Sequence, residues 1–260
     1  MPGLDWRKSI RTTISHSSAA IVLRTRSFGE SDKIVSFLTR DFGKISGIAK
    51  GALKSKRRFV ASLEPFTHVR LAFRTRRHHE LCFIESADIV RGARRLAFDL
   101  DRYAYSTYVV ELVDSMIEGQ EAEAAIFELV DRTLERVDSD PDPPVAEWLR
   151  AFEVKLLTLT GFEPRIDRCA RCQRPSANGG ETNVHFNPRT GTLLCHVCAD
   201  GTGMSVSCDA IRYLAALKND TSPAPAPSAG EVRVILQTFI AHHARRPLKS
   251  PALLREILGV

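Results

Sequence analysis

Hydrophobic and polar residues alternate in short stretches over the part of the chain that follows residue 19. β-Branched and aromatic residues gather in these stretches, which is typical of strands. Glycines and the segment Asp41-Phe42-Gly43 separate them at points where turns are expected. The pattern predicts strands over 20–23, 33–38, 44–48, 68–73 and 81–84. Five short strands within about 70 residues suit a small barrel such as the OB-fold better than a sandwich.

After Arg91 the apolar residues recur with the spacing of helices. Residues 220–230 are rich in Pro, Ala and Ser, cannot form a core, and are expected to be a flexible surface loop. The predicted fold class is therefore α+β, with an N-terminal OB-fold β-barrel over 19–91 and an α-helical domain over 92–260. The apolar stripes that predict helices lie at 105–117, 125–137, 145–159, 211–217, 232–240 and 253–258.

Four cysteines form two Cys-x-x-Cys pairs, Cys169 with Cys172 and Cys195 with Cys198, separated by 22 residues. Each pair can place two sulfurs on one side of a tight turn, and four thiolates complete the tetrahedron that zinc accepts in structural sites. Strand-forming residues flank a turn between the pairs. The sequence therefore predicts a zinc ribbon, residues 165–203, inserted into the helical domain and holding one structural zinc ion.

Alternatives to this metal site stay open at the level of the sequence. Cysteines so spaced can form disulfides in a secreted protein, and His185 or His196 can replace a sulfur as a ligand. Residues 1–18 are polar and basic and lack the apolar core of an export signal, so we expect a flexible arm and a reducing, cytoplasmic environment. No run of about 18 apolar residues occurs, so no membrane span is expected.

Charge is distributed unevenly along the chain. Residues 1–91 contain 18 Lys and Arg against 8 Asp and Glu, whereas residues 92–260 contain 19 against 23. The net charge of +6 therefore combines a front part at +10 with a back part at −4. A basic surface attracts phosphate groups, which points to nucleic-acid binding by the barrel.

The basic residues of the barrel concentrate between residues 44 and 77, where Glu64 is the one acidic residue. A solvated loop normally mixes both signs of charge, so this run favours contact with DNA. Phe59, Phe66 and Phe73 are interleaved with it and either stack on bases or fill the core. The predicted DNA-binding residues are Lys44, Lys50, Lys54, Lys56, Arg57, Arg58, Arg70, Arg74, Arg76 and Arg77.

No constellation of catalytic residues stands out, and the protein is predicted not to be an enzyme. Leu53 and Ile48 stand where a phosphate-binding loop around Lys54 needs glycine. His78 and Glu80, followed by a Cys-x-x-Cys pair, superficially match a zinc deaminase, but the spacing is too long and the second pair would be unused.

A zinc-ribbon transcription or RNA-binding regulator is the alternative function. In that case the ribbon itself contacts nucleic acid through basic side chains. The basic residues available for this role are Arg168, Arg171, Arg174 and Arg189.

A series of short motifs resembles the bacterial DNA repair protein RecO family. The front motifs are Val22-Leu23-Arg24, the segments 28–35 and 38–44, and Ala49-Lys50-Gly51. A basic loop, Leu63-Glu64-Pro65-Phe66, a helical middle, the two Cys-x-x-Cys pairs and a late Leu248-Lys249-Ser250 follow in the order of the family. The resemblance covers roughly residues 19–258.

This resemblance implies a DNA repair and recombination mediator. Members of the family that this chain resembles have an OB-fold followed by a helical domain with a zinc ribbon, which is similar to the fold predicted here. Its members bind single- and double-stranded DNA, anneal strands coated by single-stranded DNA-binding protein, and work with RecR to load RecA. The resemblance therefore implies these partners, a zinc cofactor and a cytoplasmic, nucleoid-associated location. It places Lys50 and Gly51 in the family's basic loop, and its metal positions at Cys169, Cys172, Cys195 and Cys198.

Overall fold

The computed structural model describes residues 13–76, 80–119, 122–142, 146–176, 183–219 and 228–258. Contacts divide the chain into two compact units, one of residues 1–94 and 118–131 and the other of residues 95–117 and 132–260. The first unit contains a closed β-barrel, and the second contains helices and a small sheet. The α+β fold class predicted from the sequence is therefore confirmed.

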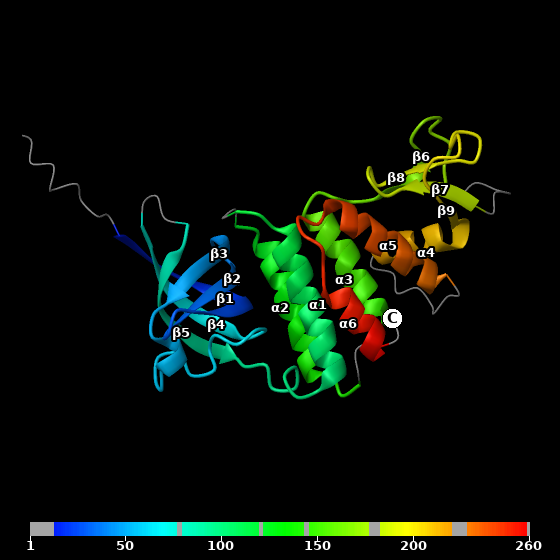
Figure 1. Cartoon of the computed structure of the whole chain (residues 1–260). Coiled ribbons are helices and arrows are strands. Elements are labelled where there is room, and N and C mark those ends of the chain that lie inside the picture. The colour runs from blue at the N-terminus through cyan, green and yellow to red at the C-terminus, as the bar shows by residue number, and fades with distance from the viewer. Residues whose placement is uncertain are drawn as a thin grey trace, which may run out of the picture. The chain divides into compact units, whose positions relative to one another are not determined.

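Five strands form the barrel, in the order β1-β2-β3-β5-β4 around the closed sheet (Figure 1). Neighbouring strands are antiparallel, except that β3 and β5 are parallel. Because side chains alternate between the two faces of a strand, every second residue points inward, and these residues form one buried core. The strands are β1 (Thr13–Phe28), β2 (Asp32–Thr39), β3 (Gly43–Ala49), β4 (His68–Arg76) and β5 (Cys82–Arg91).

β1 is much longer than the strand predicted over 20–23. Residues 13–21 pair with β4, and residues 20–28 pair with β2. An irregularity between Val22 and Arg24 lets the strand bend from one partner to the other. Residues 13–18, which the sequence assigned to a flexible arm, thus belong to the barrel, and residues 1–12 lie outside the described part. Residues 13–18 are mostly polar, so the apolar pattern did not predict this part of the strand, which is held by backbone pairing.

β3 and β5 approach each other closely where the barrel closes. Gly47 pairs with Cys82, and a Cβ atom at Gly47 would lie 2.4 Å from Cδ1 of Ile84 and 2.7 Å from Sγ of Cys82. Ile84 and Cys82 are both buried, so neither can move aside without disturbing the core. Glycine at position 47 therefore permits the closure of the barrel.

Residues 118–131 group with the barrel, although the sequence assigned them to the helical domain. This segment contains the first half of α2 (Ala124–Ser139). Asp131 of this helix forms ion pairs with Arg91 and with Nδ1 of His68, the latter at 3.0 Å. The ring of Phe127 packs edge-on against His68 at 5.6 Å between centroids. These contacts explain why the segment belongs to the first unit.

The helices of the second unit each bury one face in a shared core. α1 contacts α3 and α6, and α3 also contacts α4 and α5. Tyr105, Phe152, Leu214 and Phe239 are among the buried side chains between them. No helix within the described ranges is long and apolar enough to cross a membrane. These helices are α1 (Leu100–Met116), α3 (Ala146–Leu159), α4 (Cys208–Lys218), α5 (Ala229–His243) and α6 (Ser250–Leu258).

The start of α5 at Ala229 shortens the loop predicted over 220–230. Residues 229 and 230 are helical, and residues 220–227 lie outside the described ranges.

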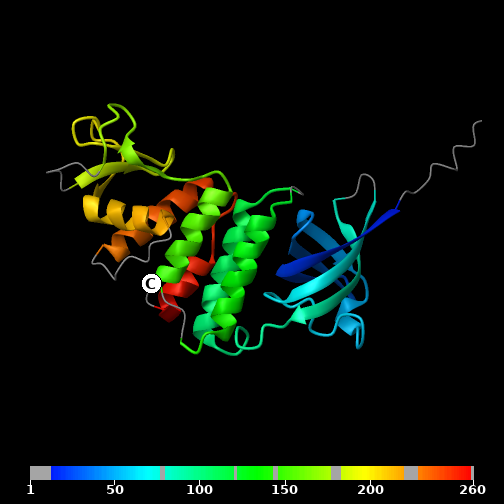
Figure 2. The same ribbon diagram turned by 180° about the vertical axis from the view of Figure 1, so that it is seen from behind.

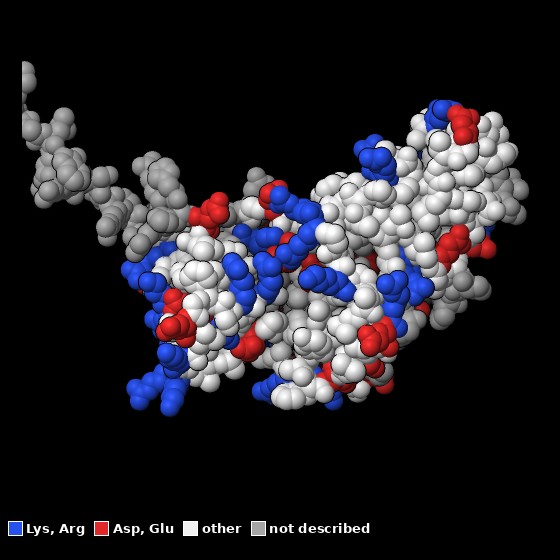
Figure 3. Space-filling view, viewed as in Figure 1, with Lys and Arg blue, Asp and Glu red and all other residues white. Residues whose placement is uncertain are grey.

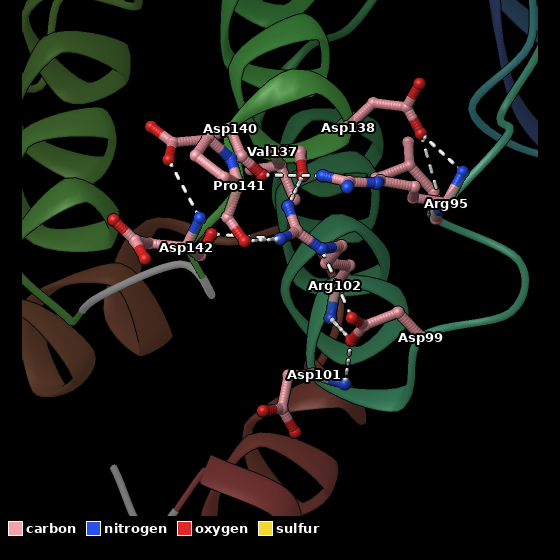
Figure 4. Close-up of polar contacts among 10 residues, drawn as sticks. Arg95, Asp99, Asp101, Arg102, Val137, Asp138, Asp140, Pro141 and Asp142 are labelled. Carbon is pink, nitrogen blue, oxygen red and sulfur yellow. Dashed lines mark hydrogen bonds and ion pairs between the residues drawn. The ribbon is translucent and has the colours of Figure 1, made fainter.

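A buried arginine joins α1 to the C-terminal end of α2 (Figure 4). The guanidinium of Arg102 donates to the carbonyl of Val137, and to those of Pro141 and Asp142 at 3.3 and 2.9 Å. Its Nε donates to Asp99 at 3.2 Å, and this carboxylate also caps the first turn of α1. Because the last carbonyls of a helix have no intrahelical partner, Arg102 satisfies groups that would otherwise be buried alone.

A four-stranded sheet of order β6-β8-β7-β9 is inserted between α3 and α4 and lies beside α4 and α5 (Figures 1 and 2). β7 and β8 form the hairpin predicted from the sequence, through a turn in which Gly191 has φ 65°. A Cβ atom at Gly191 would lie 2.9 Å from the ring of Phe239, so glycine at this position also allows α5 to pack closely against the turn. The strands are β6 (Arg165–Cys169), β7 (Asn183–Asn187), β8 (Thr192–Leu194) and β9 (Met204–Ser207).

We expect Gly47→Ala to lower the free energy of unfolding of the barrel by about 1–3 kcal/mol, because the added methyl overpacks a closed core. Urea unfolding followed by circular dichroism measures the loss, and hydrogen exchange of β3 and β5 assigns it to the barrel. Gly92→Ala is the matched control, since the nearest contact of a Cβ there is Cγ2 of Ile89 at 4.0 Å. Equal stability of the two variants would contradict the closure argument.

Candidate metal centre and nucleic-acid interface

Four cysteine sulfurs converge at one end of the ribbon sheet. The sulfurs of Cys169, Cys172, Cys195 and Cys198 all lie within 4.8 Å of one another. The Sγ atoms of Cys172 and Cys195 are 3.8 Å apart. A regular tetrahedron with metal–sulfur distances of about 2.3 Å has edges of about 3.8 Å. The predicted set of cysteines is therefore brought together in a form that can hold a metal ion.

Backbone turns place the two cysteine pairs. Cys169 ends β6, and its carbonyl accepts from the N–H of Gln173 at 3.0 Å, with Gln173 at φ 62°. In the second pair, the N–H of Cys198 donates to the carbonyl of Cys195 at 3.0 Å. The strand pairing of β6 with β8 brings the first turn beside the second. Each turn thus fixes two sulfurs, and the sheet fixes the turns relative to each other.

The pKa values of two cluster cysteines shift in opposite directions. The hydrogen bond with the sulfur of Cys195, followed by desolvation, raises the pKa of Cys198 to about 12, whereas Cys169 is the cysteine that favours ionised sulfur, the form that binds metals. Desolvation opposes ionisation of Cys169, but the backbone N–H groups of Cys172, Cys195 and Arg171 donate to its sulfur and lower its pKa to about 6. Arg171 forms an ion pair at 2.6 Å with Asp200, which lies beyond the second cysteine pair. This pair links the two turns across the exposed side of the cluster.

Neither histidine proposed as a substitute ligand belongs to the cluster found among the described residues. His185 lies on β7, and His196 is exposed between the second pair of cysteines. Four sulfurs fill a tetrahedral shell, so the arrangement leaves no position for the deaminase-like set of His78 and Glu80. His78 itself lies outside the described residues.

The basic residues after β3 form a loop, residues 50–58, which we call the basic loop. Ala52 and Phe59, one within it and one next to it, are buried in the barrel core and anchor it. The hydroxyl of Ser55 accepts from the N–H groups of Arg58 and Phe59, each at 3.1 Å. The guanidinium of Arg58 donates to the carbonyl of Lys50 and lies 4.4 Å from the centroid of Phe59. The loop is therefore held in a defined shape.

Lys54, Lys56 and Arg57 project from the basic loop into solvent. None of the three forms an ion pair with a residue in the described ranges. Glu64, the acidic residue of the predicted run, is occupied by Lys33 at 2.9 Å. Lys and Arg side chains lie over the barrel in Figure 3, and a group protrudes at its lower left, where Figure 1 draws the segment after β3.

The other predicted DNA-binding residues lie elsewhere on the barrel. Lys44 is at the opposite end of β3 from Lys50, about 20 Å away along the strand. Arg70 and Arg74 lie on β4 beside acidic residues of β5, with Arg70 opposite Asp88 in register and Arg74 paired with Glu85 at 2.8 Å. Arg76 is also on β4, and Arg77 lies outside the described residues. The structure thus divides one sequence run into separate groups.

The three interleaved phenylalanines belong to the interior. Phe59, Phe66 and Phe73 are 5%, 7% and 1% exposed. Of the two interpretations that the sequence left open, the structure supports core packing over base stacking.

Arg24 and Arg26 are exposed basic residues of β1 that are absent from the predicted set of DNA-binding residues. Both point away from the barrel, two residues apart on one strand, because side chains alternate. The predicted strand ended at Leu23, so these arginines fell outside it. The alternation of Leu23, Arg24, Thr25 and Arg26 is the signal that identifies them.

The helical unit contains a cavity of about 410 Å³ between α1, the end of α5 and the start of α6. Its walls are largely apolar, with Ile240, Ala241 and Leu248 among them, and Arg245 and Arg246 also line it. Arg246 also forms an ion pair with Asp114. The hydroxyl of Tyr108, another wall residue, donates to the buried carboxylate of Glu153.

Comparison with known proteins assigns both parts of the chain. Residues 14–93 match the family model described as recombination protein O N terminal, and residues 97–252 match the model described as recombination protein O C terminal. A DNA repair protein RecO from Anaeromyxobacter sp. (strain K) is 36% identical over 245 residues, covering 91% of this chain and 94% of the relative. The DNA repair protein RecO of Syntrophus aciditrophicus is 32% identical over 258 residues, covering 95% and 98%. The chain therefore belongs to the RecO family of DNA repair proteins.

Proposed function

We propose that the protein binds single- and double-stranded DNA through the barrel and anneals complementary strands, without acting as an enzyme. The observation that carries the proposal is the basic loop, whose exposed cations Lys54, Lys56 and Arg57 have no acidic partner among the described residues. Cations bound to phosphates release counterions and reduce the repulsion between two DNA backbones. This mechanism favours annealing of any complementary pair and needs no sequence-specific contact.

The proposed partners follow from membership of the family. We propose that the protein acts with RecR on strands coated by single-stranded DNA-binding protein, and so assists the loading of RecA in the cytoplasm, close to the nucleoid. We propose that the acidic, apolar tail of single-stranded DNA-binding protein binds in the cavity between α1, α5 and α6. Apolar residues line this cavity together with Arg245 and with Arg246, which is also paired with Asp114.

We further propose that the four cysteines hold one structural zinc ion. Thiolates in a tetrahedral set are the ligands of zinc and of iron–sulfur centres, and a set of four closes the site to substrates. When bound, the ion contributes folding energy to the ribbon. Cys169, Cys172, Cys195 and Cys198 supply the ligands, and the pair of Arg171 with Asp200 supports the turns.

We predict that Lys54→Glu, Lys56→Glu and Arg57→Glu combined weaken binding of a single-stranded oligonucleotide by about two orders of magnitude and abolish annealing. If about five cations contact phosphates, the log–log salt slope of the unmodified protein is near −3.5, and losing three contacts reduces it by about 2. Fluorescence anisotropy across a salt series measures both quantities.

The matched control for this variant reverses the same charge in the ribbon, through Arg168→Glu, Arg174→Glu and Arg189→Glu. All three arginines are exposed, and the change in net charge is identical. We expect these substitutions to weaken binding severalfold at most. A larger loss from the ribbon variant than from the loop variant would instead support the zinc-ribbon regulator.

Metal analysis of the purified protein should find one zinc per chain, and Cys172→Ser should retain less than about a tenth of it after dialysis. Hydrogen exchange should then rise in the strands β6–β9 while the barrel stays protected. Cys208→Ala is the control, because Cys208 lies outside the cluster and should leave the zinc content unchanged. Stoichiometric iron, or an unchanged ribbon after metal loss, would rule out this proposal.

Ala241→Glu should weaken binding of a peptide that carries the tail of single-stranded DNA-binding protein by about tenfold, because it places a negative charge at the cavity wall. Ala241→Gln has the same size without the charge and should bind within about threefold of the unmodified protein. Anisotropy of the labelled peptide gives both values. Equal affinities of the two variants would place the tail elsewhere.

A further inference from the structure

An acidic residue lies directly beside the basic loop, where an opposing charge is unfavourable for binding phosphates. Asp32 is the first residue of β2, just after the turn that follows β1. Its Oδ1 accepts from the backbone N–H of Gly51 at 2.8 Å and from the hydroxyl of Ser31 at 2.9 Å. The N–H of Gly51, then the Ser31 hydroxyl and the charge of Lys50, lower the pKa of Asp32. The group is therefore ionised at neutral pH.

The contact with Asp32 determines how the basic loop begins. Gly51 has φ 69°, a left-handed conformation that redirects the chain from β3 into a short 3-10 helix, η2 (Ala52–Lys54). The N–H of Leu53 donates to the carbonyl of Ser31 at 2.9 Å, which adds a second tie to the same turn. Two backbone donors of the loop thus end on the consecutive residues Ser31 and Asp32, where the turn after β1 leads into β2.

These ties decide the direction in which the cations project. At its other end the loop is held by Ser55 and by the buried ring of Phe59. With both ends fixed, the exposed residues Lys54, Lys56 and Arg57 have less freedom to change position relative to one another. If the first end is released, Lys54 moves with the segment, because η2 has no side-chain cap of its own.

We propose that Asp32 is a positioning residue for DNA binding: its carboxylate fixes the start of the basic loop so that Lys54, Lys56 and Arg57 face phosphates together. The inference rests on the proposed function of that loop. Asp32 costs some electrostatic attraction for DNA, and the order that it imposes outweighs this cost. A pre-organised site loses less conformational entropy on binding than a mobile one.

Glu30 offers a matched comparison within the same turn. It lies two residues before Asp32 and carries the same charge, but it is exposed and makes no hydrogen bond or ion pair with a residue in the described ranges. If charge alone mattered, removal of either carboxylate would tighten DNA binding. If position matters, the two substitutions have opposite effects.

The test compares Asp32→Ala, Asp32→Asn and Glu30→Ala in the full-length protein, using anisotropy of a labelled single-stranded oligonucleotide. If the binding-competent loop falls to about one tenth of the population, Asp32→Ala binds about tenfold more weakly, despite the gain of positive charge. Asp32→Asn keeps an acceptor for the N–H of Gly51 and should bind within about twofold of the unmodified protein or tighter. Glu30→Ala should bind equally well or tighter. Equal or tighter binding by Asp32→Ala would overturn the proposal.

Trypsin supplies a readout that does not involve DNA, because Lys54, Lys56 and Arg57 are cleavage sites within the basic loop. Asp32→Ala should be cut there severalfold faster than Glu30→Ala, with unchanged thermal unfolding. An unchanged cleavage rate would refute the positioning role. The charge-reversed loop variant separates the two proposals. If it retains full DNA binding, the proposed function of the loop fails; if it loses binding and Asp32→Ala does not, the inference about Asp32 fails alone.

Discussion

Closure of the barrel between β3 and β5 is the constraint on which the proposed DNA-binding surface depends. The two strands share a parallel contact at Gly47 with Cys82 and at Ile48 with Phe83. Gly47 has no side chain, and the core residue Ile84 fills the space that a Cβ would occupy. A shift of β3 by one residue would turn its buried side chains outward, so the register is fixed by the core. Because the basic loop begins at Lys50, one residue beyond β3, this register also fixes where its cations begin.

Polar side chains solve a different problem in the helical unit, where helix ends would bury backbone groups without partners. Arg102 donates to the carbonyl of Val137 in the last turn of α2 and to two carbonyls that follow the helix. Glu111 accepts from the N–H groups of Lys249 and Ser250 at the start of α6. A metal ion bound by four sulfurs would play a similar part in the ribbon, whose strands are too short to enclose a large core. In each case a charged side chain or a metal ion holds together segments that have too little apolar surface to be held by packing alone.

The sequence predicted those features that depend on neighbouring residues. Alternating side chains gave the hairpin of β7 and β8, and cysteine spacing gave the metal cluster, because both are local patterns. The sequence missed the start of β1, whose mostly polar residues 13–18 are held by pairing with β4. It also gave no sign that residues 118–131 contact the barrel, because that contact joins Asp131 to His68 across a long sequence separation. Long-range pairing leaves little mark on local periodicity.

The basic residues between 44 and 77 lie in separate groups on the barrel, so they do not all contribute equally to the attraction of DNA phosphates. Composition treats all ten residues as equivalent, but the structure places Arg74 in an ion pair with Glu85, whereas Arg70 only lies opposite Asp88 in the strand register. A cation already paired with a carboxylate has less effect on nearby phosphates, and its pairing must be disrupted before it binds one. Lys54, Lys56 and Arg57 carry no such pairing among the described residues. The salt dependence of DNA binding should therefore report the number of cations in the basic loop rather than the net charge of the barrel, since counterion release depends on the phosphates that are neutralised.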